Sequence, residues 1–234
     1  MALLVEPLLL LPGTLCDARL WGPALDRLCH PDVRVPVLRD ASSAPELARM
    51  LLREAPPRFA LAGFSLGAIV ALEMIAQAPA RVARLAVVAG NARADEPESS
   101  TRRQQMLETA RRDGVRAVVE RDLWRSYVSA KSFGDARLRA LIGDMAEDVG
   151  VAALGEQTVI AMRRTDSRPR LSGIAVPTLV VAGADDRVCP PERGAEIAAA
   201  ISRSSFAEMP GVGHFVPLEA ADHLSEEFRK WLRA

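Results

Sequence analysis

The chain has 234 residues, of which 49% are hydrophobic and 26% are charged, and 30 Lys and Arg balance 30 Asp and Glu. This composition is that of an ordinary globular protein, and it argues against a disordered chain, a collagen-like chain or a coiled coil. A net charge of zero lacks the electrostatic attraction that nucleic acid or an anionic membrane surface requires, so we expect neither as a partner.

The earliest apolar run, Leu3–Leu11, is interrupted by a charged residue and a proline. It is also far shorter than the ~20 residues of a membrane-spanning helix, so it predicts a buried strand. Three widely spaced cysteines, Cys16, Cys29 and Cys189, indicate neither a disulfide framework nor a zinc site. We therefore expect no metal and a reducing, cytoplasmic location.

Short apolar runs of strand length recur along the chain and alternate with helix-like segments. The predicted strands are Leu8–Leu11, Val33–Leu38, Phe59–Gly63, Leu85–Ala89, Thr178–Ala182 and Ser205–Met209. Ala44–Glu54 has apolar residues at helical spacing, and Leu66–Gln77 is apolar on nearly all sides, as in a helix buried against a sheet. This alternation predicts an α/β fold with a mostly parallel sheet that has helices on both faces.

The alternation stops between Asn91 and about Arg170, where we find no strand-like run. This stretch is charged and compatible with helix, and aromatic and methionine residues recur in it. After Pro177 the strand and helix pattern resumes. We therefore expect a core made of residues 1–90 and 171–234, with residues 91–170 inserted as a helical cap.

The clearest chemical signal is the GxSxG motif Gly63-Phe64-Ser65-Leu66-Gly67, which lies between a predicted strand and a predicted helix. In that context the serine occupies a sharp, strained turn that exposes its hydroxyl, and the glycines let neighbouring chains approach closely. The helix start behind the serine favours developing negative charge. The motif thus predicts Ser65 as a nucleophile.

A serine hydroxyl becomes an effective nucleophile when a base takes its proton, and the usual base is histidine. Of the three histidines, His30 lies in a loop far upstream and His223 lies on the C-terminal helix, where we expect it to be exposed. His214 follows the strand Ser205–Met209 in a glycine-flanked loop, which can place its imidazole at the sheet edge where Ser65 emerges. His214 is the predicted base.

The base needs a carboxylate that holds its tautomer and stabilises the imidazolium. Asp185 and Asp186 both follow the strand Thr178–Ala182, and each could instead form a turn or cap a helix. Spacing from the strand end favours Asp186. The chain order Ser65, Asp186, His214 is the order of nucleophile, acid and base in one particular fold.

On these motifs the chain resembles the α/β-hydrolase superfamily, and in particular its small, capped members that are similar to serine carboxylesterases. The resemblance covers nearly the whole chain. It also rests on Leu11-Pro12-Gly13-Thr14 with Trp21, Asp166-Ser167-Arg168-Pro169, Val176-Pro177-Thr178-Leu179-Val180, Gly183-Ala184-Asp185-Asp186, and Gly211-Val212-Gly213-His214 with Glu219. In that family the aspartate three residues after the glycine is the triad acid, which again indicates Asp186.

The resemblance implies an oxyanion hole formed by two backbone N–H groups, those of Leu66 and Thr14. Thr14 has a second interpretation, as a plain turn residue after Gly13. Cys16 and Cys189 lie in loops near the same edge, and we interpret them as packing residues because neither has a base of its own.

Four large side chains are candidates for binding the substrate. They are Trp124, Tyr127 and Met162 in the cap, and Phe215 beside the predicted base. Cap residues of these types at helical spacing pack a helical core as readily as they line a pocket. The arginines Arg163-Arg164 suit a substrate carboxylate, whereas solvation or pairing with Asp166 is the simpler interpretation.

Together these features predict a serine hydrolase that cleaves a small carboxylic ester, thioester or lactone without a metal or an organic cofactor. We expect a mostly apolar cavity for short or medium acyl groups, and a small ester-type molecule as the substrate. The same three residues also suit carbon–carbon bond hydrolysis, a lyase reaction or perhydrolysis. A hydrolase fold that has lost catalysis and only binds a ligand is a further alternative, against which the complete residue set argues.

Overall fold

The computed structural model describes residues 6–234, and its central feature is a six-stranded sheet with the order β2-β1-β3-β4-β5-β6. All neighbouring strands are parallel. The strands are β1 (Leu8–Leu11), β2 (Val33–Arg34), β3 (Phe59–Phe64), β4 (Val82–Val88), β5 (Thr178–Gly183) and β6 (Ser204–Met209). The α/β fold with a parallel sheet, predicted from the apolar runs, is confirmed.

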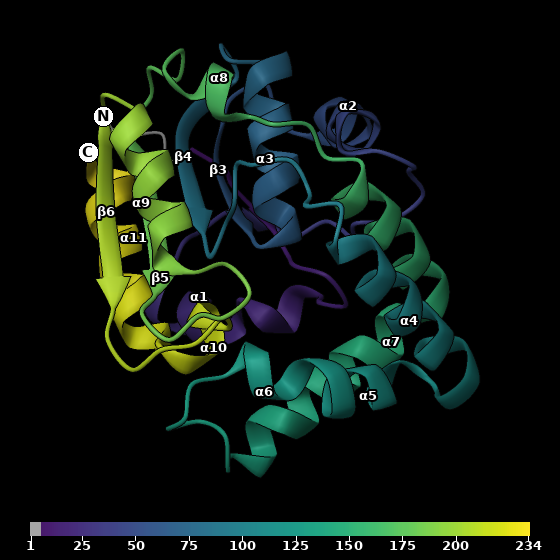
Figure 1. Cartoon of the computed structure of the whole chain (residues 1–234). Helices are drawn as coiled ribbons and strands as arrows, with labels where there is room; N and C mark the ends of the chain where they lie inside the picture. The colour runs from purple at the N-terminus through teal and green to yellow at the C-terminus, as the bar shows by residue number, and fades with distance from the viewer. Residues whose placement is uncertain (1–5) are drawn as a thin grey trace.

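Helices cover both faces of the sheet (Figure 1). They are η1 (Ala18–Leu20), α1 (Gly22–Leu28), α2 (Ala44–Glu54), α3 (Leu66–Gln77), α8 (Arg168–Leu171), α9 (Pro191–Ala200), α10 (Val216–Glu219) and α11 (Ala221–Arg233). Helices α2, α3 and α9 share a core with Leu9 and Leu11, whereas α1 and α11 share one with Leu8 and Leu10. This alternation follows because successive strand residues point to opposite faces of a sheet.

The prediction for the second strand is wrong over its later part. Only Val33 and Arg34 pair with β1, although we expected a strand to Leu38. Pro36 has no N–H group to donate to a strand ladder, and β2 lies at the edge of the sheet. Val37 follows it with 51% of its surface exposed.

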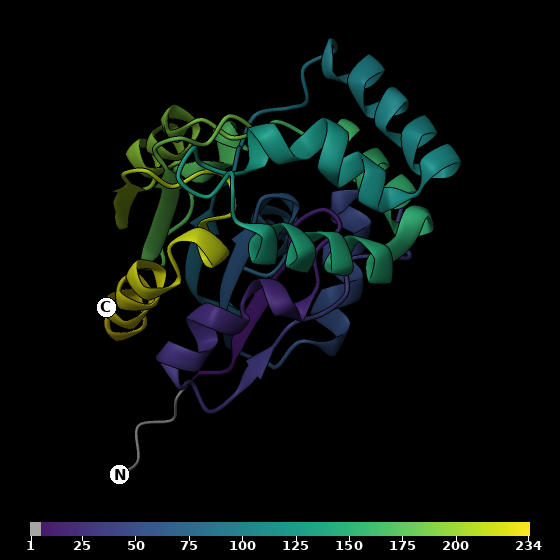
Figure 2. The same ribbon diagram turned by 90° about the horizontal axis from the view of Figure 1, so that it is seen from below.

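The chain between β4 and β5 forms helices and, among the described residues, no strand. Besides α8, these helices are α4 (Ser99–Asp113), α5 (Val115–Val118), the π-helix η2 (Val119–Leu123), α6 (Trp124–Tyr127) and α7 (Ala136–Met162). They gather on one side of the molecule, and α5 and α6 lie beyond the carboxyl ends of the strands (Figures 1 and 2). Helix α7 is broken at Gly150, whose φ of 82° suits glycine. Within residues 6–234, no helix combines the length and the apolar character needed to cross a membrane.

Candidate active site

Ser65 lies on the turn between β3 and α3 with backbone angles φ 52° and ψ −111°. A positive φ costs free energy in a residue with a side chain, so the surrounding structure must hold it. The Ser65 N–H donates to the carbonyl oxygen of Val88 at 3.0 Å. A Cβ on Gly63 would lie 2.3 Å from the carbonyl oxygen of Gly67, and a Cβ on Gly67 equally close to that of Leu11. The expected steric need for both glycines is therefore visible at this turn.

Three predicted residues are joined by hydrogen bonds. The Oγ of Ser65 lies 2.9 Å from Nε2 of His214, and Nδ1 of His214 lies 2.7 Å from Oδ2 of Asp186. Both His214 and Asp186 are buried. His30 lies before β2, and His223 is exposed on α11. The structure brings together the serine, histidine and aspartate that the sequence selected, in the spacing of a Ser-His-Asp relay.

The carboxylate of Asp186 is fully engaged. While Oδ2 faces the imidazole of His214, Oδ1 accepts hydrogen bonds from the N–H groups of Val188 at 2.7 Å and Cys189 at 2.9 Å. These bonds compensate for burying the charge and fix the orientation of the carboxylate. Asp185 is exposed and has no hydrogen bond to His214 among the described residues. Of the two adjacent candidates, only Asp186 contacts the imidazole.

The loop that carries His214 is held by the segment after α6. The backbone N–H of His214 donates to the carbonyl oxygen of Tyr127 at 2.8 Å. The carboxylate of Glu219 accepts from the N–H of Gly213 at 3.1 Å and from the N–H of Ser129 at 2.9 Å. Sequence reasoning noted Glu219 only as a motif residue, because its bridge to Ser129 spans 90 positions. Glu219 therefore positions the histidine loop against the helical segment.

Two backbone donors lie beside the serine hydroxyl. Thr14 and Leu66 line the same cavity as Ser65. Within residues 6–234, neither of their N–H groups makes a hydrogen bond. A pair of unengaged N–H groups near a nucleophile is the arrangement that can stabilise an oxyanion.

A buried glutamine from α7 fixes the loop that carries Thr14. The Oε1 of Gln157 accepts from the N–H of Leu15 at 2.9 Å, and its Nε2 donates to the carbonyl oxygen of Leu38 at 2.9 Å. Leu15 has a φ of 56°, so this hydrogen bond supports a strained turn. Only 1% of Gln157 is exposed. No local sequence signal pointed to Gln157, because its two partners lie more than a hundred positions away.

A cavity of about 110 Å³ opens beside the serine hydroxyl. Its lining residues are Thr14, Ser65, Leu66, Ile69, Asn91, Arg103, Tyr127, Ala161, Arg164, Val188 and Cys189. The expectation of a mostly apolar cavity is wrong, because two arginines and an asparagine are among the residues that line it. Arg164 was expected to pair with Asp166, but it pairs with Asp95, and Asp166 pairs with Arg168 instead. The small volume leaves room for a small substrate only.

Of the four predicted substrate-binding residues, only Tyr127 lines this cavity. Trp124 is 2% exposed, and its indole N–H donates to the carbonyl oxygen of Phe133 at 3.1 Å, so it packs the core of the helical segment. Phe215, the residue after His214, is buried. Met162, in the last turn of α7, does not line the cavity either. For Trp124 the helical spacing reflects packing between helices and not contact with a ligand.

The cysteines near this edge are weak nucleophiles. Burial raises the pKa of the Cys16 thiol well above its usual value. It also raises the pKa of Cys189 to about 12, with a smaller contribution from the nearby Asp186 carboxylate. Neither thiol is ionised near neutral pH, which supports the packing interpretation. Among residues 6–234, no three His, Cys, Asp or Glu side chains form a cluster that could hold a metal ion.

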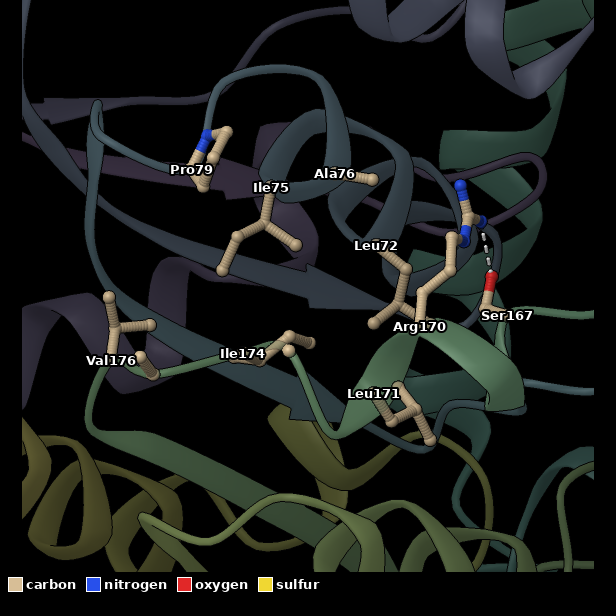
Figure 3. Close-up of a pocket in the computed structure, with 11 residues that line it drawn as sticks. Leu72, Ile75, Ala76, Pro79, Ser167, Arg170, Leu171, Ile174 and Val176 are labelled. Atoms are coloured by element: carbon tan, nitrogen blue, oxygen red, sulfur yellow. Dashed lines mark hydrogen bonds between the residues drawn. The ribbon is translucent and has the colours of Figure 1, made fainter.

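A larger hollow of about 340 Å³ lies between α3 and the segment from α8 to β5 (Figure 3). Its walls are mostly aliphatic, and its one charged residue, Arg170, bonds to Ser167 at 2.7 Å and to the buried Glu73 at 2.5 Å. It contains no histidine among its lining residues. It reaches Ile75, which is ten positions beyond Ser65 or roughly 15 Å along the helix. Ser65 lines the smaller cavity and not this hollow.

The model of the alpha/beta hydrolase family matches residues 8–227. The chain is 30% identical over 198 residues to the "Putative carbamate hydrolase RutD" of Klebsiella pneumoniae subsp. pneumoniae, covering 83% of this chain and 73% of that protein. A thermophilic esterase from Thermogutta terrifontis superposes with a TM-score of 0.83 at 25% identity, covering 97% of this chain and 89% of that one. The enol-lactonase from Burkholderia xenovorans LB400 superposes with a TM-score of 0.87 at 22% identity, covering 98% and 92%. The last likeness concerns the fold alone.

Proposed function

Because this chain belongs to the alpha/beta hydrolase family, we propose that it is a serine hydrolase that cleaves a small carboxylic ester, thioester or lactone. The observation that carries this proposal is the hydrogen-bonded chain from Ser65 through the buried His214 to Asp186. The strained turn at Ser65 and the esterase among the structural relatives support it.

In the proposed mechanism, the neutral imidazole of His214 donates its Nδ1–H to Asp186, so Nε2 is free to accept a proton. Nε2 takes the proton of Ser65 as Oγ attacks the carbonyl carbon of the substrate, and Asp186 stabilises the imidazolium that forms. His214 then gives this proton to the leaving alkoxide or thiolate. Water, activated by the same histidine, releases the acid from the acyl-serine.

The negative charge that develops on the carbonyl oxygen needs donors that are already in place. We assign this role to the N–H groups of Leu66 and Thr14, neither of which makes a hydrogen bond within the described part of the chain. Removing one such donor typically lowers kcat by about 10²–10³-fold. Because both donors are backbone groups, side-chain identity at these positions matters little.

We further propose that residues 91–170 act as a cap over a core of residues 1–90 and 171–234, of which residues 1–5 lie outside the described chain. Several lining residues of the cavity, among them Arg103, Tyr127 and Arg164, come from this inserted stretch. The cap therefore supplies one wall of the space in which the substrate lies.

The relative named as a carbamate hydrolase favours a second candidate, hydrolysis of a carbamate. The attack of Ser65 is the same, but the acyl carbon carries nitrogen in place of carbon. Carbon–carbon bond hydrolysis, a lyase reaction and perhydrolysis also suit these three residues. Slow turnover of simple esters would favour one of these reactions, while the intact hydrogen-bonded chain argues against a protein that only binds its ligand.

The deciding experiment compares the wild type with Ser65→Ala on nitrophenyl acyl esters of graded chain length, on lactones and on a nitrophenyl carbamate. We expect kcat/KM to rise over the shortest acyl chains and then fall as the cavity of about 110 Å³ fills. Ser65→Ala should lose both this activity and labelling by a fluorophosphonate while keeping its circular dichroism spectrum. Wild-type labelling of the alanine variant would exclude Ser65 as the nucleophile, and specificity that climbs to long-chain emulsified esters would exclude a bounded cavity.

A further inference from the structure

Two arginines beside the serine share a single carboxylate. Nε and Nη2 of Arg103 donate to the two carboxylate oxygens of Asp95, each at 3.0 Å. Nη1 of Arg164 donates to Oδ1 of the same carboxylate at 2.6 Å. The side chains of Asp95 and Arg164 are 7% and 9% exposed, and that of Arg103 is 27% exposed. Two positive charges and one negative charge leave this cluster with one uncompensated positive charge.

The residues that line the cavity include no Asp or Glu. The carboxylate of Asp186, behind Val188 and Cys189, is already engaged by His214 and two backbone N–H groups. Two further arginines nearby already have partners of their own. Arg193 lies 3.5 Å from Glu96, and Arg93 lies 2.9 Å from Glu196. The excess positive charge therefore belongs to the cavity wall.

The two arginines differ in how many of their donors are engaged. Besides its bond to Asp95, Arg164 donates to the carbonyl oxygens of Arg93 at 2.8 Å and Ala161 at 3.0 Å. Arg103 bonds only to Asp95, and within residues 6–234 its Nη1 group makes no hydrogen bond. Arg164 thus anchors the cluster, while Arg103 keeps a donor for a ligand.

We propose that Arg103, supported by Arg164, binds a carboxylate of the substrate, so that the preferred esters are small ones that carry a free carboxylate on the acyl or the alcohol part. This inference rests on the proposed hydrolase function. A partly buried positive charge in excess of its counter-charges is costly, and a bound carboxylate would remove that cost. The planar guanidinium matches a carboxylate in shape and charge. A monoanion balances the single excess charge, and the cavity of about 110 Å³ accepts a short chain.

The test uses two pairs of esters that differ in the carboxylate. The first pair, nitrophenyl succinate and nitrophenyl butyrate, carries or lacks it on the acyl side. The second pair, O-acetylglycolate and propyl acetate, carries or lacks it on the alcohol side and is followed by acid release at constant pH. We expect the wild type to prefer the acidic member of at least one pair by roughly ten- to a hundredfold in kcat/KM, the range that one charge-assisted hydrogen bond supports.

Three variants test the assignment of this preference to Arg103. Arg103→Met should remove most of the preference, chiefly through a higher KM for the acidic ester. An interaction that is equally strong in the bound substrate and in the transition state affects KM and not kcat. Arg103→Lys should keep part of it, since it retains the charge but not the planar fork. The matched control is Arg111→Met, which removes the same charge from the exposed face of α4, roughly 12 Å further along the helix. This control should leave the preference unchanged.

Binding of succinate to Ser65→Ala protein, measured by calorimetry, separates this inference from the proposed function. If neutral esters are hydrolysed through Ser65 but neither acidic ester is preferred, the inference is overturned and the function stands. It is also overturned if Arg103→Met lowers the melting temperature without changing the preference. If no ester is hydrolysed but succinate binds to Ser65→Ala and not to the Arg103→Met variant, the carboxylate site stands and the proposed reaction fails.

Discussion

The cavity beside Ser65 has two walls that are built in different ways. The wall from the sheet consists of turns that follow β1, β3, β5 and β6, and its polar groups are a hydroxyl, an imidazole and backbone N–H groups. The wall from the inserted helices consists of side chains, among them Arg103, Tyr127 and Arg164. Backbone geometry at the ends of strands is specified by short motifs, whereas the side-chain wall depends on pairings between distant residues. Under the proposed function, the first wall would carry the reaction and the second would select its substrate.

The largest expected effect on kcat concerns the sheet wall. Asp186→Asn should lower kcat by up to ~10⁴-fold, because an amide in place of the carboxylate favours the wrong imidazole tautomer. Asp185→Asn, which changes an exposed neighbour with the same charge, is the matched control and should change kcat by less than about twofold. Steady-state kinetics on one nitrophenyl ester measures both. If Asp185→Asn shows the larger loss, the acid is assigned to the wrong aspartate.

A smaller effect on kcat is expected when a contact between helix α7 and the sheet wall is removed. Gln157→Leu leaves the N–H of Leu15 and the carbonyl oxygen of Leu38 without their buried partner, which should cost about 1–3 kcal/mol of unfolding free energy. Because Leu15 adjoins Thr14, we expect kcat to fall roughly tenfold with little change in KM, as for an interaction made in the transition state. Glu156→Gln, on the neighbouring residue of α7, is the control. A change in stability with kcat unaltered would make Gln157 a packing residue only.

The smallest effect concerns the strain at Ser65. Its φ of 52° is unfavourable for serine and alanine but accessible to glycine. Among inactive variants, Ser65→Gly should therefore unfold at a free energy about 1 kcal/mol higher than Ser65→Ala, in spite of the greater chain entropy of glycine. Chemical denaturation of both variants measures the difference. Equal stabilities would show that the turn stores no strain at this residue.

The residues of the sheet wall could be predicted from the sequence because the constraints on them are local. The strand, the two glycines and the helix start that surround Ser65 lie within a few positions of it, and Asp186 could be chosen by its distance from a strand end. The edge strand was the exception, since one proline ended a run of suitable apolar residues. These are short-range rules of backbone sterics and hydrogen bonding.

The helical wall could not be predicted in the same way. Asp95 and Arg164 are 69 positions apart, and in a chain with 30 residues of each charge no local pattern selects this pair. Asp166, two positions from Arg164, was the natural partner by proximity, but Arg168 is nearer in space. Trp124 and Met162 showed the periodicity of cap residues, which does not specify which face of a helix meets the cavity. Pairings of this kind follow from the packing of helices as whole bodies.

The hydrogen bonds between the inserted helices and the core also bear on modularity. The carbonyl oxygen of Tyr127 and the N–H of Ser129 meet the histidine loop, and Gln157 meets the loop of Thr14. The position of these helices and the geometry of the proposed base and oxyanion donors therefore depend on each other. A graft of the corresponding segment from another hydrolase would have to restore all three contacts before it could transfer a new specificity.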